Sequence, residues 1–186
     1  MAIRPIVKLG EPNDAVLRRP SSRVNPRDLH SKSMQQLIDD MFETMRDAPG
    51  VGLAAPQIGL PWRLVVVEKV HDDFPELVLV NPEIVKRSGE RRVSEGCLSV
   101  PGYQGELTRA ASVVVKALDR HGKEIRIKAP PNSLLSQALE HEIGHLNGNL
   151  YIDNLASRDD LYRITPAPRR SDGSAATATK EADEAG

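Results

Sequence analysis

With 186 residues, 39% of them hydrophobic and 27% charged, the chain is long enough for one globular domain with a sizeable core. Its 25 basic and 26 acidic residues give a formal charge of −1, which argues against direct binding to nucleic acid or to an anionic membrane. No apolar run approaches the length of a membrane span, and the first residues lack the apolar core of a signal peptide, so we expect a cytoplasmic protein.

The first third of the chain predicts extended segments, one helix and an apolar loop. Four prolines within the first 30 residues favour extended chain and turns. Between about residues 33 and 47, apolar side chains recur every three or four positions, which predicts an amphipathic helix capped by Ser31 or Ser33. The next segment, 50–59, is rich in glycine yet apolar, which is typical of buried backbone that approaches a neighbouring group closely. A tight connection between helix and strand is the simpler interpretation.

The middle of the chain predicts an antiparallel sheet, and a second helix follows it. Short runs rich in Val and Ile, separated by turn signals, predict strands at 62–68, 77–81, 84–93, 112–118 and 124–128. Because these strands follow one another through short turns, we expect antiparallel pairing. Residues 132–147 then predict a helix that is capped by Asn132 or Ser133 and ended by Gly148.

These elements predict an α+β fold in which small antiparallel sheets pack around a central metal-binding helix. We expect one catalytic domain in residues 1–166. Residues 167–186 contain no apolar side chain larger than Ala or Pro, so they cannot bury enough surface to offset the entropy of ordering. This segment therefore predicts a disordered C-terminal tail.

The second predicted helix carries the pattern His141-Glu142-Ile143-Gly144-His145. Histidines four residues apart lie on one face of a helix, so both imidazoles can reach one metal ion. Glu142 lies beside them, where its carboxylate can handle the proton of a bound water. This H-E-x-x-H pattern predicts two ligands and the acid/base of a hydrolytic metal site; the alternative is a solvated helix with two incidental histidines.

A third protein ligand is missing from the segment after the motif. Tyr151 stands where a metzincin would have its third histidine, and no histidine follows His145. The upstream candidates are the single cysteine, Cys97, and three histidines in predicted turns or loops: His30, His71 and His121. A thiolate is chemically the best choice, because it completes a two-His, one-Cys tetrahedral site with an open fourth position. A buried inert cysteine and a cysteine nucleophile with a histidine base are the alternatives.

Three segments together resemble the peptide deformylase family: residues 50–57 (Gly-Val-Gly-Leu-Ala-Ala-Pro-Gln), 95–99 (Glu-Gly-Cys-Leu-Ser) and 137–148 around the H-E-x-x-H pattern. They match the family's motifs in order and at typical spacing, and the similarity extends from residue 3 to about residue 153. The resemblance implies a hydrolase that removes the formyl group from the N-terminal formyl-methionine of newly synthesised polypeptides and releases formate. Metal-bound water would attack the formyl carbon, with Glu142 as general acid/base.

The resemblance also implies roles for single residues. The implied metal ligands are Cys97, His141 and His145. The groups implied to stabilise the oxyanion are the side chain of Gln57 and the backbone N–H of Leu98. The implied substrate-binding residues are Val51, Gly52 and Gly96, and the implied supporting pair is Glu95 and Arg109. The family most often has Asp where this chain has Gly144, which removes a carboxylate from the motif.

One divalent metal ion per chain is implied by the resemblance, usually Fe²⁺, and Zn²⁺, Ni²⁺ or Co²⁺ can occupy the same ligands. The implied partners are N-formyl-methionyl nascent polypeptides and the ribosome near its exit tunnel, and we expect a monomer. Two other functions fit the residues. One is an H-E-x-x-H metallopeptidase that cleaves unmodified peptide bonds, and the other is a non-catalytic metal-binding domain of the same fold.

Overall fold

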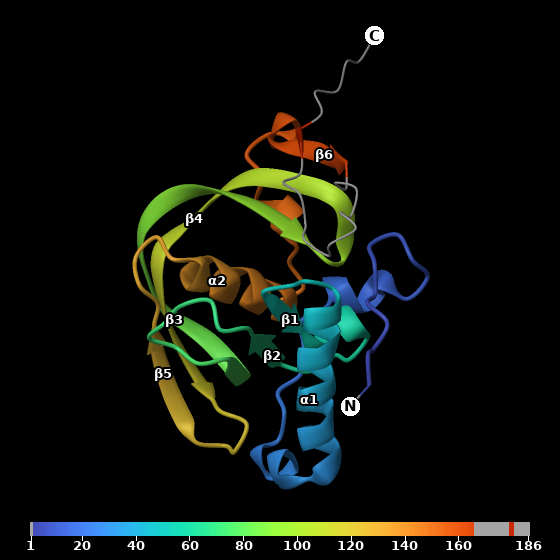
Figure 1. Ribbon diagram of the computed structural model, residues 1–186, viewed down its shortest axis with the longest axis vertical. Helices are drawn as coiled ribbons and strands as arrows, with labels where there is room; N and C mark the ends of the chain where they lie inside the picture. Colours follow the sequence, from blue (N-terminus) through green and yellow to red (C-terminus); the bar gives the residue numbers. More distant parts are fainter. Residues whose placement is uncertain (1, 166–178, 181–186) are drawn as a thin grey trace, which may run out of the picture.

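The computed structural model describes residues 2–165 and 179–180, which fold into one bent antiparallel sheet and two α-helices (Figure 1). The helices are α1 (Lys32–Asp47) and α2 (Leu134–Leu146). The strands are β1 (Gly52–Ala54), β2 (Leu64–Val67), β3 (Leu77–Cys97), β4 (Val100–Leu118), β5 (Glu124–Lys128), β6 (Leu161–Thr165) and β7 (Thr179–Lys180). Their order is β1-β2-β3-β4-β6-β7, with β5 also paired to β4. The α+β class is confirmed, and the strands join one sheet instead of several small ones.

Short 3-10 helices occupy several of the connections. Their bounds are Asp14–Arg18, Pro26–His30, Ala55–Ile58, Tyr151–Asn154 and Arg158–Asp160. No helix within the described part of the chain is long and apolar enough to cross a membrane.

Both α-helices begin at serine caps that the sequence predicted. The Oγ atoms of Ser31 and Ser133 each accept a hydrogen bond from the backbone N–H three residues later, at 3.2 and 3.1 Å. These bonds satisfy N–H groups that have no partner inside the first helical turn. After α2, Gly148 takes a left-handed conformation with φ +78°, where a side chain would be strained. The predicted start and stop of the second helix are therefore confirmed.

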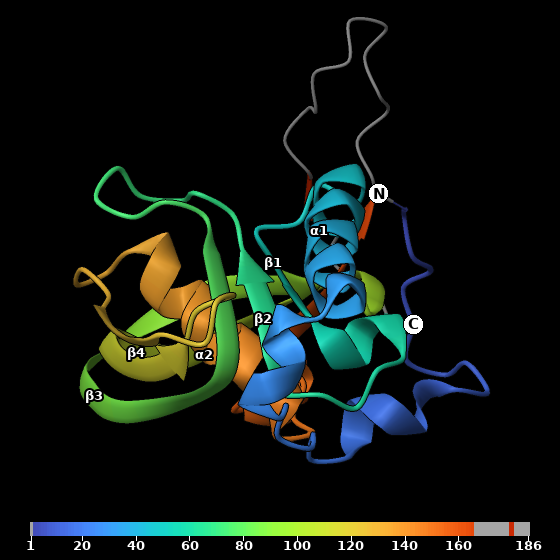
Figure 2. The ribbon, with the colours of Figure 1, turned by 90° about the horizontal axis from the view of Figure 1, so that it is seen from below.

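Strand β2 explains how the two helices come to lie on opposite faces of the sheet. All four of its residues are buried: Val65 and Val67 belong to the core around α2, while Leu64 and Val66 belong to the core around α1. A continuous apolar run is typical of a strand that is covered on both faces. Figure 2 shows β1 and β2 between the two helices. The Val-rich segment 64–67 therefore links the two cores.

Strands β3 and β4 form a long hairpin that curves around α2 (Figure 1). The sequence predicted shorter strands, at 77–81, 84–93 and 112–118, and these bounds were wrong because turn signals lie inside the hairpin. The ladder continues past 81–82 through a register shift, with Asn81 at φ +52°, and past 88–89 with Gly89 at φ +65°. As a result β3 is one continuous strand. It ends at Cys97, immediately before the turn that joins it to β4.

Three further strands, β1, β6 and β7, were not predicted from the sequence. β1 forms inside the apolar segment 50–59, and β6 pairs with residues 103–105 of β4. The predicted tail, 167–186, lies outside the described residues except for Thr179–Lys180, whose backbone pairs with β6. The sheet therefore extends past β4 toward the C-terminal part of the chain.

The N-terminal segment is tied to α1 by the buried carboxylate of Asp40. This side chain accepts hydrogen bonds from the backbone N–H of Ala2 at 2.8 Å and from the guanidinium of Arg4 at 2.8 and 3.1 Å. The hydrogen bonds from Arg4 outweigh the effect of burial and hold the pKa of Asp40 at about 2. The ionised form of Asp40 is therefore the one that anchors the first residues.

Replacing this carboxylate by Asp40→Asn should lower the free energy of unfolding at neutral pH by about 1–2 kcal/mol. The pKa of Asp40 is lower in the folded chain than the ordinary value of 3.8, so its stabilisation is complete above that pH. It is lost as the pH falls toward about 2. Urea denaturation of both proteins across this pH range measures the effect. A difference between them that stays constant down to the lowest pH would contradict the assignment.

Candidate metal centre and catalytic cleft

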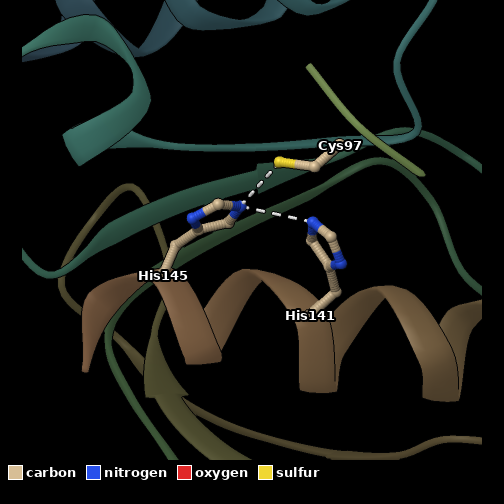
Figure 3. A group of neighbouring side chains, drawn as sticks. All are labelled: Cys97, His141 and His145. Carbon is tan, nitrogen blue, oxygen red and sulfur yellow. Dashed lines mark hydrogen bonds between the residues drawn. The ribbon is translucent and has the colours of Figure 1, made fainter. Parts of the chain in front are cut away.

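Helix α2 and the end of β3 bring three metal-ligating side chains together (Figure 3). The Sγ atom of Cys97 lies 3.3 Å from Nε2 of His145, which in turn lies 3.2 Å from Nε2 of His141. The three ligand atoms all lie within 4.8 Å of one another. The loop histidines that the sequence left as alternatives, at positions 30, 71 and 121, are not part of this group.

The spacing of these atoms fits a divalent cation. In a tetrahedral site with metal–sulfur bonds of about 2.3 Å and metal–nitrogen bonds of about 2.0 Å, neighbouring ligand atoms lie roughly 3.3–3.5 Å apart. Two of the three separations, 3.3 and 3.2 Å, come close to that range, and the third, between Sγ of Cys97 and the ligand nitrogen of His141, is within 4.8 Å. Three protein ligands leave one position for water or substrate, and both Cys97 and His141 line a surface cleft.

A buried ion pair orients the first histidine. Arg109 donates two hydrogen bonds of 2.8 Å to the carboxylate of Glu95, and Nδ1 of His141 lies 2.8 Å from Oε2 of that carboxylate. Burial alone would raise the pKa of Glu95, but the hydrogen bonds and charges of Arg109 and His141 outweigh it and lower the pKa to about 2. Because the Nδ1 proton is held by Glu95, His141 presents Nε2 to the other two side chains.

Glu142 lies beside the three ligands and also lines the cleft. Its side chain is buried, and burial raises its pKa to about 7, more than the charge of His141 lowers it. Among the described residues, Oε2 of Glu142 has no hydrogen-bond partner. A carboxyl group with a pKa near neutrality, and with one oxygen unengaged, can both accept and donate a proton.

Gly52 of β1 lies directly against Glu142. A Cβ atom added at Gly52 would lie 2.5 Å from Oε1 of Glu142 and 2.8 Å from its Cδ. Only glycine lets the backbone of β1 approach this carboxyl group so closely. The apolar, glycine-rich segment 50–59 is therefore more than a connection between two elements.

Gln57 follows β1 and turns its side-chain amide toward Cys97. Its Oε1 accepts a hydrogen bond from the backbone N–H of Ala54 at 2.8 Å, which fixes the orientation of the amide. Its Nε2 lies 3.6 Å from Sγ of Cys97 and 3.4 Å from Oγ of the buried Ser99, for which the sequence predicted no role. Both contacts are long, so the N–H groups of Gln57 are weakly engaged and can bond a closer acceptor in the cleft without a change in the orientation of the amide.

One cleft of about 530 Å³ joins these groups. Besides the ligands Cys97 and His141, the residues with sequence-predicted roles that line it are Val51, Gly52, Gln57, Glu95, Gly96, Leu98 and Glu142. Three lining residues on α2 were not predicted, although their spacing from His141 places them on its helical face: Leu134, Gln137 and Ala138. Tyr103 and Gln104 on β4 and Ile164 on β6 were not predicted either, because no motif marks them.

Replacing Gly52 by alanine and replacing Gly144 by alanine should change the free energy of unfolding in opposite directions. Gly52→Ala forces the added Cβ into Glu142, and overpacking of this kind lowers the free energy of unfolding by about 1–3 kcal/mol. Gly144→Ala meets only the backbone oxygen of Asn149, at 3.8 Å, and alanine in a helix gains about 0.5–1 kcal/mol over glycine. Urea denaturation of the metal-free proteins measures both. If both substitutions changed the free energy of unfolding in the same direction, the close approach of Gly52 to Glu142 would be refuted.

Comparisons with known proteins identify the family of this chain. Residues 3–160 match the family model of polypeptide deformylase. The chain is 55% identical over 166 residues to the peptide deformylase of Dehalococcoides mccartyi (strain CBDB1), across 89% of this chain and 94% of that relative. It is 44% identical over 172 residues to the peptide deformylase of Xylella fastidiosa (strain M12), across 91% and 98%.

Solved structures give the same result. The crystal structure of a peptide deformylase from Legionella pneumophila is similar with a TM-score of 0.75 and 49% sequence identity, across 83% of this chain and 87% of that one. An actinonin-bound class I type b peptide deformylase from Acinetobacter baumannii is similar with a TM-score of 0.74 and 33% identity, across 84% and 100%. This chain belongs to the polypeptide deformylase family.

Proposed function

We propose that this chain, a hydrolase of the peptide deformylase family, removes the N-terminal formyl group of newly synthesised polypeptides at the cleft beside α2. In this proposal Cys97, His141 and His145 hold one divalent cation. The observation that carries it is the meeting of three ligand atoms within 4.8 Å beside the buried carboxyl group of Glu142. When bound, the cation supplies Lewis acidity, which polarises a carbonyl group and acidifies water. Fe²⁺ is the proposed ion by resemblance to the family, and Zn²⁺, Ni²⁺ and Co²⁺ suit the same donors.

Glu142 is proposed to move the protons of the reaction. It takes one proton from the water that attacks the formyl carbon and passes it to the nitrogen of the departing amine. The formyl C–N bond breaks, so that the amide and one water become formate and a free N-terminus. The pKa of about 7 supports this role, because Glu142 can then both accept and release a proton near neutral pH.

Gln57 and Leu98 are proposed to stabilise the negative charge that develops on the formyl oxygen. The donors are the side-chain N–H of Gln57 and the backbone N–H of Leu98, which lies between β3 and β4 and lines the cleft. The amide of Gln57 is already oriented by Ala54, so little reorganisation is needed at the moment of reaction. Glu95 and Arg109 are proposed as the pair that orients the imidazole of His141, so that its Nε2 can bind the metal.

The substrate is proposed to lie as an extended chain against β1. This strand is at the edge of the sheet, and an edge strand can pair with an added peptide. Val51, at 41% exposure, and Gly52 lie on one side of the cleft, and Gly96 lines it from β3. These three positions are the proposed contacts with the backbone of the formylated polypeptide.

We further propose one catalytic domain in residues 1–166, in agreement with the family match to 3–160. A monomer is proposed, since a single chain supplies the three ligands, Glu142 and the lining of the cleft. The ribosome near its exit tunnel is the proposed place of action, and the cytoplasm the proposed compartment, because nascent formylated chains emerge there.

Cys97→Ala should strongly reduce metal binding, because the thiolate supplies one of three protein ligands. Metal analysis of protein purified without oxygen measures the stoichiometry. The matched control is Ser99→Ala, which truncates a buried neighbour outside the ligand group and should keep the metal. An unchanged stoichiometry and coordination spectrum in Cys97→Ala would exclude the cysteine as a ligand.

Formate release from formyl-Met-Ala-Ser tests the function itself, with unformylated Met-Ala-Ser as the comparison peptide. The metal-loaded wild type should release formate and leave the unformylated peptide intact. Cleavage of the unformylated peptide would indicate another kind of metallopeptidase. Glu142→Gln keeps the size of the side chain but cannot take up the proton, so formate release should fall by about 10²–10⁴-fold while the metal is retained. Full activity of this variant would exclude the acid/base role of Glu142.

A further inference from the structure

Strand β6 supplies a part of the cleft that lies outside the family match. Ile164 lines the cleft together with Ser94 and Gly96 of β3 and Gln104 of β4, and its side chain is half-buried. The family model matches residues 3–160, so Ile164 lies beyond it. This residue is therefore a candidate for a property that the shared motifs do not determine.

The register of the strands explains why Ile164 faces the cleft. Gln104 lies opposite Gly96 in β3 and opposite Tyr162 in β6, and residues paired in this way point to the same face of a sheet. Ile164 follows Tyr162 by two positions, so it points to that face as well. The hydroxyl group of Tyr162 lies 2.9 Å from Oγ of Ser94, which agrees with this placement.

Side-chain contacts from β6 hold this wall in place. On the cleft face, the hydroxyl group of Tyr162 lies 3.2 Å from Oε1 of Glu106 and 3.5 Å from Oε1 of Gln104. Arg163, which alternates with Tyr162 and Ile164 along β6, places its guanidinium over the ring of Tyr103, 5.7 Å from its centroid, and Tyr103 also lines the cleft. Ile164 is thus presented by a strand that is fixed to β4 and not by a free chain end.

The distance from Ile164 to the candidate metal centre corresponds to several substrate residues. Neighbouring strands lie about 4.8 Å apart, and residues along a strand rise by about 3.3 Å. From Gly96, the neighbour of Cys97, the path crosses two strand spacings and then runs two residues along β6, which gives a separation of roughly 12 Å. An extended peptide covers this distance in about three to four residues.

From this placement we infer that Ile164 is a specificity-determining residue, which contacts the second or third residue after the formylated methionine and favours apolar side chains there. The inference rests on the proposed function and adds a selective contact to it. Val51 and Leu134, two exposed apolar side chains that also line the cleft, support an apolar preference. An apolar substrate side chain that covers Ile164 removes hydrocarbon from water on both partners.

Introducing a positive charge at position 164 tests the inference. The substrates are formyl-Met-Ala, formyl-Met-Ala-Leu-Leu and formyl-Met-Ala-Asp-Asp, each assayed for formate release by the metal-loaded enzyme. The wild type should prefer the Leu-Leu peptide over the Asp-Asp peptide. Ile164→Lys should lower kcat/KM for Leu-Leu by about fivefold and raise it for Asp-Asp by a similar factor, and added salt should reduce that gain. Formyl-Met-Ala is too short to reach residue 164, so its kcat/KM should stay within about twofold.

Two further variants keep the test decisive. Val85→Lys adds the same charge at an apolar position that is 42% exposed on β3 outside the cleft, and it should leave all three substrates unchanged. Ile164→Ala avoids the charge; it should weaken turnover of the Leu-Leu peptide about threefold and leave formyl-Met-Ala unchanged, even if the lysine variant folds poorly.

The outcomes separate the two proposals. No formate release by the wild type from any formylated peptide would overturn the proposed function. If the wild type is active and both Ile164→Lys and Ile164→Ala keep its preference among the three peptides, the assignment of Ile164 alone is overturned. An equal fall on all three peptides, including formyl-Met-Ala, would overturn it as well, since that pattern indicates a structural role.

Discussion

The buried ion pair between Glu95 and Arg109 is the interaction on which the candidate site depends. It joins β3 to β4, and through the contact of Glu95 with His141 it also joins the sheet to α2. Burying two charges is costly unless each is paired and hydrogen-bonded, and here three contacts of 2.8 Å meet one carboxylate. A pair of this kind adds little net stability over an apolar replacement. The contribution of the Glu95–Arg109 pair is to orient the imidazole of His141.

The fold was predictable from the sequence where the signals act over a few residues. Serine caps and the three-to-four spacing of apolar side chains identified both helices, because each of these interactions lies within one or two turns. The sheet was predicted only in pieces, since ladder hydrogen bonds come from partners distant in sequence and carry β3 through the turn signal at 81–82. β6 has five residues and no strong pattern, and it forms because residues 103–105 of β4 offer it an edge.

The same distinction applies to the site. One helix positions the H-E-x-x-H residues, so their spacing alone was enough to find them. No spacing connects Cys97 to that helix, and only the chemistry of thiolate ligands and the family resemblance selected it. The pairing of Glu95 with Arg109 rested on the resemblance alone, because Glu95 lies opposite Gly105 in the ladder and Arg109 reaches it along the strand. Ile164 had no signal, because its place depends on the register of β6.

The burial of β2 on both faces limits where this molecule can move. β2 cannot separate from its neighbours without exposing the core around α1 and the core around α2 together, so local opening there costs nearly as much as complete unfolding. The rim of the cleft differs, because Val51 and Leu134 are 41% and 45% exposed and lie at the beginnings of β1 and α2. The exposed rim of the cleft can therefore rearrange without exposing either core, whereas β2 cannot.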